Sequence, residues 1–127
     1  MVTLDQLVGS DFVAVGEFNI GELDDFRVPD AGVLPVGATL AEGGIFFPTA
    51  ILVAEVLSPR DDSYRKLGFY FRRGVCEVLL VDSDADAGRV IVLVRGEHEF
   101  ELAGQSAVLG ASAEQLTAMI IRSEAPR

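Results

Sequence analysis

The stretch Thr49-Ala50-Ile51-Leu52-Val53-Ala54-Glu55-Val56-Leu57 is the most strongly apolar run of the chain. Its length and its aliphatic content predict a central β-strand that is buried on both faces. Because side chains alternate between the two faces of a strand, Glu55 shares a face with Val53 and Leu57. An ionised carboxylate in such a place is unfavourable unless a cation or several hydrogen-bond donors compensate it. Glu55 therefore requires a partner from another part of the chain.

The segments on both sides of this strand predict an α+β fold. Alternating apolar residues indicate strands, Ser58-Pro59 ends the central strand, and a capping region at 60–63 begins a helix that ends near Gly74. The order predicts a mixed β-sheet with one crossover helix and a short C-terminal helix. The expected strands are 11–20, 26–30, 49–57, 75–82, 89–95 and 97–102, the expected helices are about 63–73 and a short one capped by Ser112, and the glycine-rich stretch 35–44 is expected to be a loop.

Length and composition indicate one soluble domain. The chain has 127 residues, of which 50% are hydrophobic and 24% are charged, so we expect a single domain over 1–127 with a flexible tail at 123–127. No apolar run approaches the roughly 18 residues of a membrane span, and no secretory signal is visible. The single cysteine, Cys76, excludes an intrachain disulfide. These features predict a cytoplasmic protein with no membrane partner.

The charge of the chain limits the classes of function. The formal net charge is −10, which disfavours strong nonspecific binding of nucleic acid. It does not exclude an enzyme that approaches nucleic acid through a bound divalent metal. His98 is the only histidine, and it lies in an alternating run, 97–101, that is typical of an exposed strand face. A histidine-dependent mechanism is therefore not favoured.

Asp30 is the first candidate partner for a site at Glu55. It ends the expected strand 26–30, and if that strand neighbours 49–57, the two carboxylates converge on one divalent cation. Hard oxygen ligands of this kind suit magnesium or manganese. The alternative is that Glu55 lies at a sheet edge or pairs with an arginine.

Lys66 is the second candidate partner. The apolar stripe of the expected helix places Lys66 at the border of the inward face, and its long apolar stem can carry the ammonium toward Glu55. Tyr70 lies on the same face of the helix, one turn further on. The alternative is an exposed ion pair with Asp62, which precedes Lys66 by four residues. The stripe consists of Tyr64, Leu67 and Phe71.

Four segments, in this order and at these separations, resemble the Uma2 family (domain of unknown function 820), which is named "putative restriction endonuclease". They are Arg27–Asp30, Leu52–Pro59, Lys66–Tyr70 and Gly74–Asp82. The family belongs to the PD-(D/E)XK nuclease-like superfamily, and the resemblance covers roughly residues 10 to 105. It implies a restriction-endonuclease-like core. Since only about ten residues precede Asp11, it also implies that the N-terminal helix of the family is shortened or absent here.

The resemblance also implies roles for individual residues. Asp30 matches the aspartate of the Pro-Asp motif, and Glu55 matches the acidic residue of the E-x-K motif. Leu57 occupies the lysine position of that motif, and Lys66 takes its place from the following helix. The implied catalytic set is Asp30, Glu55 and Lys66. The implied ligands of Mg²⁺ (or Mn²⁺) are Asp30, Glu55 and the carbonyl of Val56.

We therefore expect a Mg²⁺-dependent endonuclease-like domain that hydrolyses DNA phosphodiester bonds. The alternative is a catalytically inactive protein-interaction domain on the same fold, which the acidic composition and the shortened first helix favour. A homodimer is also expected, with contacts near Phe12 and Phe46-Phe47 that cover apolar surface.

Overall fold

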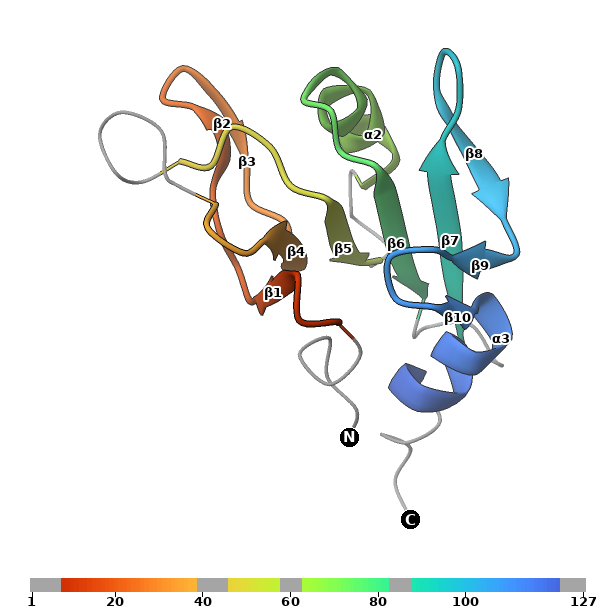
Figure 1. The fold of residues 1–127 in the computed structure, drawn as a ribbon. Helices are drawn as coiled ribbons and strands as arrows, with labels where there is room; N and C mark the ends of the chain where they lie inside the picture. The colour runs from red at the N-terminus through yellow and green to blue at the C-terminus, as the bar shows by residue number, and fades with distance from the viewer. Residues whose placement is uncertain (1–7, 39–45, 58–62, 83–87, 122–127) are drawn as a thin grey trace.

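A six-stranded mixed sheet forms the centre of the computed structural model, which describes residues 8–38, 46–57, 63–82 and 88–121 (Figure 1). The strand order is β1-β4-β5-β6-β7-β8. Among the described strand pairs of this sheet, β5 and β6 alone pair in parallel, and α2 (Ser63–Arg72) is the crossover helix between them. The six strands are β1 (Phe12–Val15), β4 (Ala31–Pro35), β5 (Leu52–Val56), β6 (Glu77–Asp82), β7 (Arg89–Arg95) and β8 (Phe100–Ala103). This architecture confirms the predicted α+β fold with one crossover helix.

β5 is an interior strand, as its apolar sequence predicts. It lies between β4 and β6, and its first four residues are buried. Val53 packs in the core layer under α2, whereas Leu52 and Ala54 pack in the layer on the opposite face of the sheet. Both faces of β5 are therefore covered, and Glu55 lies in a fully enclosed part of the strand.

A short C-terminal helix covers the second face of the sheet. α3 (Ala113–Leu116) continues into a π-helical turn at Thr117–Ile121, and Leu116 is fully buried. The Ser112 side chain accepts a hydrogen bond from the Gln115 amide, and the Gln115 side chain accepts one from the Ser112 amide. This reciprocal pair is a capping box and confirms the predicted cap.

The segment before β5 differs from the prediction. The strand at 26–30 is shorter: β3 (Asp25–Arg27) ends before Asp30 and pairs only with β2 (Ile20–Glu22). β4 itself was not predicted, because Gly32 and its closing proline lower its strand propensity. Gly32 is needed there, since a Cβ atom would lie 2.5 Å from the Phe18 ring.

Further differences concern the second half of the chain and the surface. β8 begins at Phe100, so His98 lies in the turn after β7, where it is exposed. A small pair, β9 (Gln105–Ser106) with β10 (Ala111–Ser112), precedes α3. No helix in the described part of the chain is long and apolar enough to span a membrane. The expected tail at 123–127 and the segment before Val8 lie outside the described residues.

The aromatic residues that were expected to form dimer contacts point inward instead. Phe46 is buried and its ring packs edge-to-face on Phe26. Phe47 packs against the core under α2, and Phe12 packs against the core on the other face. Phe46 is buried, and Phe12 and Phe47 are partly buried in core contacts within the chain, so the structure does not support the expected homodimer contacts.

Candidate active site

Glu55 has two polar partners on α2. Its side chain is buried, with 1% of the residue exposed. The Tyr70 hydroxyl donates a hydrogen bond to Oε1, and the Lys66 Nζ lies 3.5 Å from Oε2. Tyr70 is fully buried, whereas the Lys66 side chain is 25% exposed. Glu55 is thus compensated by a lysine and a tyrosine, and it lies in an interior strand and not at the sheet edge of the alternative interpretation.

The helical repeat explains why both partners reach the same carboxylate. Residues four apart lie on one face of a helix, so Lys66 and Tyr70 both project toward β5. The position of Lys66 beside Glu55 agrees with the prediction. The alternative partner, Asp62, lies outside the described residues.

The inward face of α2 matches the predicted stripe only in part: Leu67 packs against the core as expected. The buried residues are Phe69 and Tyr70, whereas Tyr64 is 61% exposed. The predicted stripe considers only apolar residues at helical spacing. The buried Glu55 side chain also needs a hydrogen-bond donor from this face of the helix. Tyr70 supplies that donor, so it is a site residue that sequence reasoning missed. Its spacing of one helical turn from Lys66 was the available signal.

Tyr70 is held in its protonated form. Burial raises the pKa of Tyr70 well above its usual range, and the hydrogen bond to Glu55 raises this pKa further. The phenol therefore remains a donor at neutral pH. It fixes one oxygen of the Glu55 side chain, and Lys66 lies against the other.

Asp30 is bound to the two neighbours of Glu55 in β5. The Asp30 amide donates to the Ala54 carbonyl at 3.1 Å, and the Val56 amide donates to Asp30 Oδ2 at 2.8 Å. Asp30 directly precedes Ala31, which pairs with Ala54 across β4 and β5. The negative charge of Asp30 also contributes to the raised pKa of Tyr70. Asp30 and Glu55 therefore lie at the same end of β5, with Asp30 on the exposed side and Glu55 on the buried side.

These groups fit a magnesium ion better than a zinc ion. No cluster of three or more histidine, cysteine, aspartate or glutamate side chains suited to a metal occurs within the described residues. A zinc site would require such a cluster. Mg²⁺ keeps several water ligands and binds through one or two carboxylates. Asp30, Glu55 and the Val56 carbonyl are hard oxygen donors of the kind that this ion prefers.

Glu77 is a second buried acidic residue, and it is structural. It is 4% exposed on the opposite face of the sheet. Its Oε1 accepts from the Ser106 hydroxyl at 2.6 Å, and its Oε2 accepts from the amides of Ala107 and Val108 at 3.0 and 3.2 Å. These neutral donors satisfy the carboxylate and anchor the loop before α3. Glu77 is therefore a natural control for experiments on Glu55.

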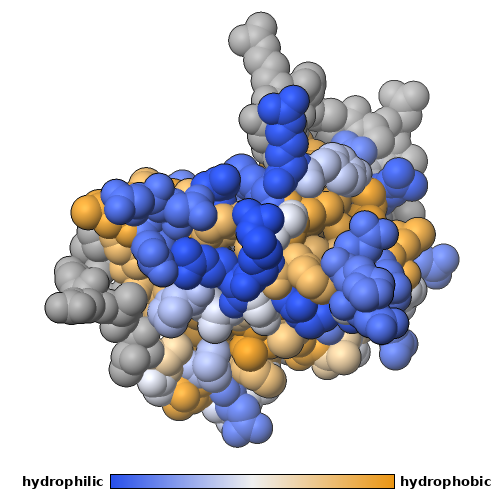
Figure 2. Space-filling model, turned by 90° about the horizontal axis from the view of Figure 1, so that it is seen from above, coloured by the Kyte–Doolittle hydropathy of each residue, from blue (hydrophilic) through white to orange (hydrophobic). Residues whose placement is uncertain are grey.

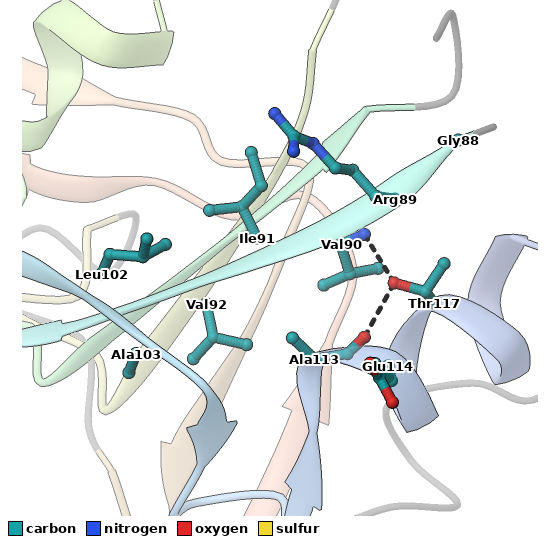
Figure 3. Close-up of a pocket in the computed structure, with 10 residues that line it drawn as sticks. All are labelled: Gly88, Arg89, Val90, Ile91, Val92, Leu102, Ala103, Ala113, Glu114 and Thr117. Atoms are coloured by element: carbon teal, nitrogen blue, oxygen red, sulfur yellow. Dashed lines mark hydrogen bonds between the residues drawn. The ribbon is translucent and has the colours of Figure 1, made fainter. Parts of the chain in front are cut away.

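A pocket of about 600 Å³ lies away from this site, between β7 and α3 (Figure 3). Thr117 closes one side: its hydroxyl accepts from the Val90 amide at 2.9 Å and donates to the Ala113 carbonyl at 2.7 Å. The charged residues of the lining, Arg89 and Glu114, point to different sides. This pocket brings no pair of carboxylates together, so the chemistry of the chain is better placed at Glu55.

Comparison with known proteins identifies the fold. A crystal structure described as "a putative nuclease belonging to DUF820", from Anabaena variabilis ATCC 29413, superposes with a TM-score of 0.61 at 22% sequence identity. The superposition covers 85% of this chain and 69% of that chain. The chain has the fold of this DUF820 protein. No protein-family model matches the chain, and no curated protein matches it.

The shared fold agrees with the DUF820 fold that the sequence resemblance implies.

Proposed function

We propose that the protein is a Mg²⁺-dependent endonuclease that hydrolyses DNA phosphodiester bonds at the Asp30–Glu55–Lys66 centre. One observation carries the proposal: a carboxylate enclosed in the sheet interior meets the ammonium of Lys66 at 3.5 Å, and a second carboxylate, Asp30, accepts a hydrogen bond from the amide of the next residue, Val56. A buried charge set of this kind is typical of a functional site. The nuclease-like fold supports the same conclusion.

Asp30, Glu55 and the Val56 carbonyl would hold Mg²⁺ or Mn²⁺ at the end of β5. When bound, the ion supplies Lewis acidity, which polarises a phosphate oxygen and lowers the pKa of a ligand water. Asp30 is already oriented by the Val56 amide at 2.8 Å. Tyr70 holds Glu55 through Oε1, so the carboxylate has little freedom to rotate. The site is thus preorganised by groups of the chain itself.

Lys66 acts on the reacting groups. Its partly exposed ammonium can orient the attacking water and neutralise charge that develops on the phosphate oxygens. In the hydrolysis, the water oxygen forms a bond to phosphorus as the bond from phosphorus to the leaving sugar oxygen breaks. The proton lost by the water balances the charge on the leaving oxygen. No covalent intermediate with the protein is needed.

The second candidate function is an inactive protein-interaction domain on the same fold. The net charge of −10 favours it, because a phosphate backbone is repelled by an acidic protein at long range. Calorimetric titration with Mn²⁺ separates the two functions. The nuclease binds one ion, and Asp30→Asn or Glu55→Gln abolishes this binding. An interaction domain that binds no ion, or whose ion binding survives both substitutions, contradicts the proposed centre.

A further inference from the structure

Two arginines converge on one aromatic ring beside the candidate active site. The Cζ atom of Arg27 lies 4.7 Å from the centroid of the Phe69 ring, and that of Arg73 lies 5.4 Å from it. Phe69 is 2% exposed, so the ring is fixed in the core. Stacking on a fixed ring limits the freedom of both guanidinium groups. The two positive charges are therefore held close together in a set place.

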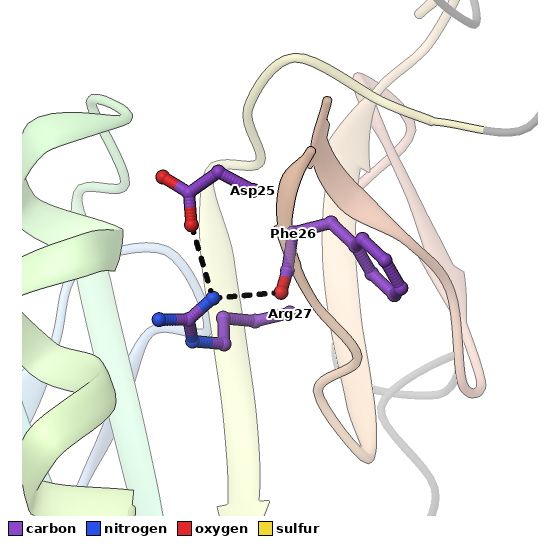
Figure 4. Close-up of polar contacts among 3 residues, drawn as sticks. All are labelled: Asp25, Phe26 and Arg27. Carbon is purple, nitrogen blue, oxygen red and sulfur yellow. Dashed lines mark hydrogen bonds and ion pairs between the residues drawn. The ribbon is translucent and has the colours of Figure 1, made fainter. Parts of the chain in front are cut away.

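The carboxylates near these arginines neutralise them only weakly. Arg27 Nη1 lies 3.2 Å from Asp25 Oδ1 and donates to the Phe26 carbonyl at 2.8 Å (Figure 4). Arg73 Nη1 lies 3.6 Å from Glu22 Oε1. Both carboxylates are mostly exposed, and exposed ion pairs contribute little. Each guanidinium carries five N–H donors, and these contacts use only Nη1, so donors remain for a planar anion.

The arginine pair is adjacent to the groups that would act on a phosphate. Phe69 directly precedes Tyr70, the donor to Glu55. Arg27 stacks on the Phe69 ring and precedes Asp30 by three residues. An anion held by the two guanidiniums would therefore lie next to the Glu55 cluster.

The helix that carries Phe69, with the residue after it, has a charge opposite to that of the whole chain, whereas the β2–β3 hairpin beside it carries the exposed acidic residues Glu22, Asp24 and Asp25. The segment 63–73 contains four basic residues and no acidic residue, although the net charge is −10. Figure 2 views the molecule from above, the end that carries α2 and the β2–β3 hairpin in Figure 1, and hydrophilic side chains gather there. The four basic residues are Arg65, Lys66, Arg72 and Arg73.

We propose that Arg27 and Arg73 bind the phosphate backbone of a nucleic acid next to the scissile position. Guanidinium groups bind phosphate oxygens in a bidentate manner, and such contacts position a strand without reading its sequence. The inference rests on the proposed function, since it extends the substrate contacts of that centre. The same pair could also meet carboxylates of an acidic peptide, so the test includes that class of partner.

Salt-dependent binding of a fluorescein-labelled DNA duplex in EDTA tests the proposal, with anisotropy as the readout. Without metal no cleavage occurs, so binding is measured separately from the proposed activity. Arg27→Gln and Arg73→Gln should each lower the slope of log K against log salt concentration by about 0.9. When the salt concentration rises tenfold, the affinity of each glutamine variant for DNA should therefore fall by a factor about eight times smaller than that of the wild type. Arg89→Gln, an exposed arginine on β7, should leave the slope unchanged.

The charge-preserving variants Arg27→Lys and Arg73→Lys should keep the slope of the wild type. This result would show that the smaller slope of the glutamine variants comes from the lost charge and not from a disturbed fold. The proposal is overturned if the two glutamine variants keep the full slope or if Arg89→Gln lowers it equally. It is also overturned if the wild type binds polyglutamate but no DNA at about 20 mM salt, where screening is weak. None of these results depends on cleavage, which the Glu55 variants test separately.

Discussion

Lys66 Nζ lies 3.5 Å from Glu55 Oε2, and the same carboxylate accepts a hydrogen bond from Tyr70 through its other oxygen. The sheet interior can therefore hold a charged residue in its most apolar strand. An unpaired carboxylate at this position would destabilise the fold, because burial penalises its charged form. The ammonium and the phenol, one helical turn apart on α2, provide the compensation. The same pair also leaves Lys66 partly exposed, where it can meet a substrate.

Lys66→Ala should abolish metal-dependent DNA cleavage and leave metal binding nearly intact. The ammonium is proposed to act on the water and the phosphate, whereas the ligands of the ion are Asp30, Glu55 and Val56. We expect the rate of cleavage to fall by at least about a hundredfold. Calorimetric titration of the same sample with Mn²⁺ measures whether metal binding is retained. Arg65→Ala, which removes the neighbouring exposed charge, is the control. Undiminished cleavage by Lys66→Ala would refute the catalytic role.

Tyr70→Phe should lower the free energy of unfolding by about 1–3 kcal/mol, because the buried Glu55 carboxylate loses a donor. Urea denaturation of the two proteins measures the difference. Tyr64→Phe removes the hydroxyl of a tyrosine that is 61% exposed and should change stability by less than about 0.5 kcal/mol. Equal effects of the two substitutions would show that the phenol of Tyr70 does not support Glu55.

The raised pKa of Tyr70 predicts a loss of stability in alkaline solution. The unfolded chain releases this proton near pH 10, whereas the folded chain retains it to higher pH. The folded state therefore binds more protons above about pH 10, and stability falls as pH rises through that range. Denaturation midpoints at about pH 9 and pH 11 should differ more for the wild type than for Tyr70→Phe. An identical alkaline decline in both proteins would assign the effect to other groups.

The sequence predicts the parts of the fold that follow from local patterns. The apolar run around Val53 predicts an interior strand, and the capping residue Ser112 predicts the start of the last helix. The prediction that Lys66 lies beside Glu55 is correct, because the helical repeat determines which residues lie at the edge of the inward face. The fold class and the main partner of Glu55 could thus be predicted.

The remaining features depend on tertiary contacts. β4 contains Gly32, which disfavours a strand locally but is required by the Phe18 ring that packs on it. Tyr70 is buried because Glu55 needs its hydroxyl, and no measure of apolar periodicity contains that requirement. The neutral donors of Glu77 come from a loop about thirty residues later, so the structural role of this carboxylate is visible only in the folded chain.

Mg²⁺ or Mn²⁺ should raise the melting temperature of the wild type, because a ligand that binds only the folded state stabilises it. At a hundred times the dissociation constant the gain is about 2.7 kcal/mol. Glu55→Gln should remove this shift. Glu77→Gln, which changes a buried carboxylate on the other face of the sheet, should retain it even if its baseline stability is lower. If the ion stabilises Glu55→Gln as much as the wild type, it binds at another place.

Cleavage of a supercoiled plasmid by proteins purified in parallel tests the proposed centre most directly. The wild type and Glu77→Gln should convert the plasmid to nicked and linear forms in Mg²⁺ and not in EDTA. Asp30→Asn and Glu55→Gln should be slower by at least about a hundredfold, because each removes a proposed ligand of the ion. A wild type that leaves the plasmid intact in both Mg²⁺ and Mn²⁺, or a Glu55→Gln variant that cleaves at the wild-type rate, would contradict the assignment of this site as a nuclease centre.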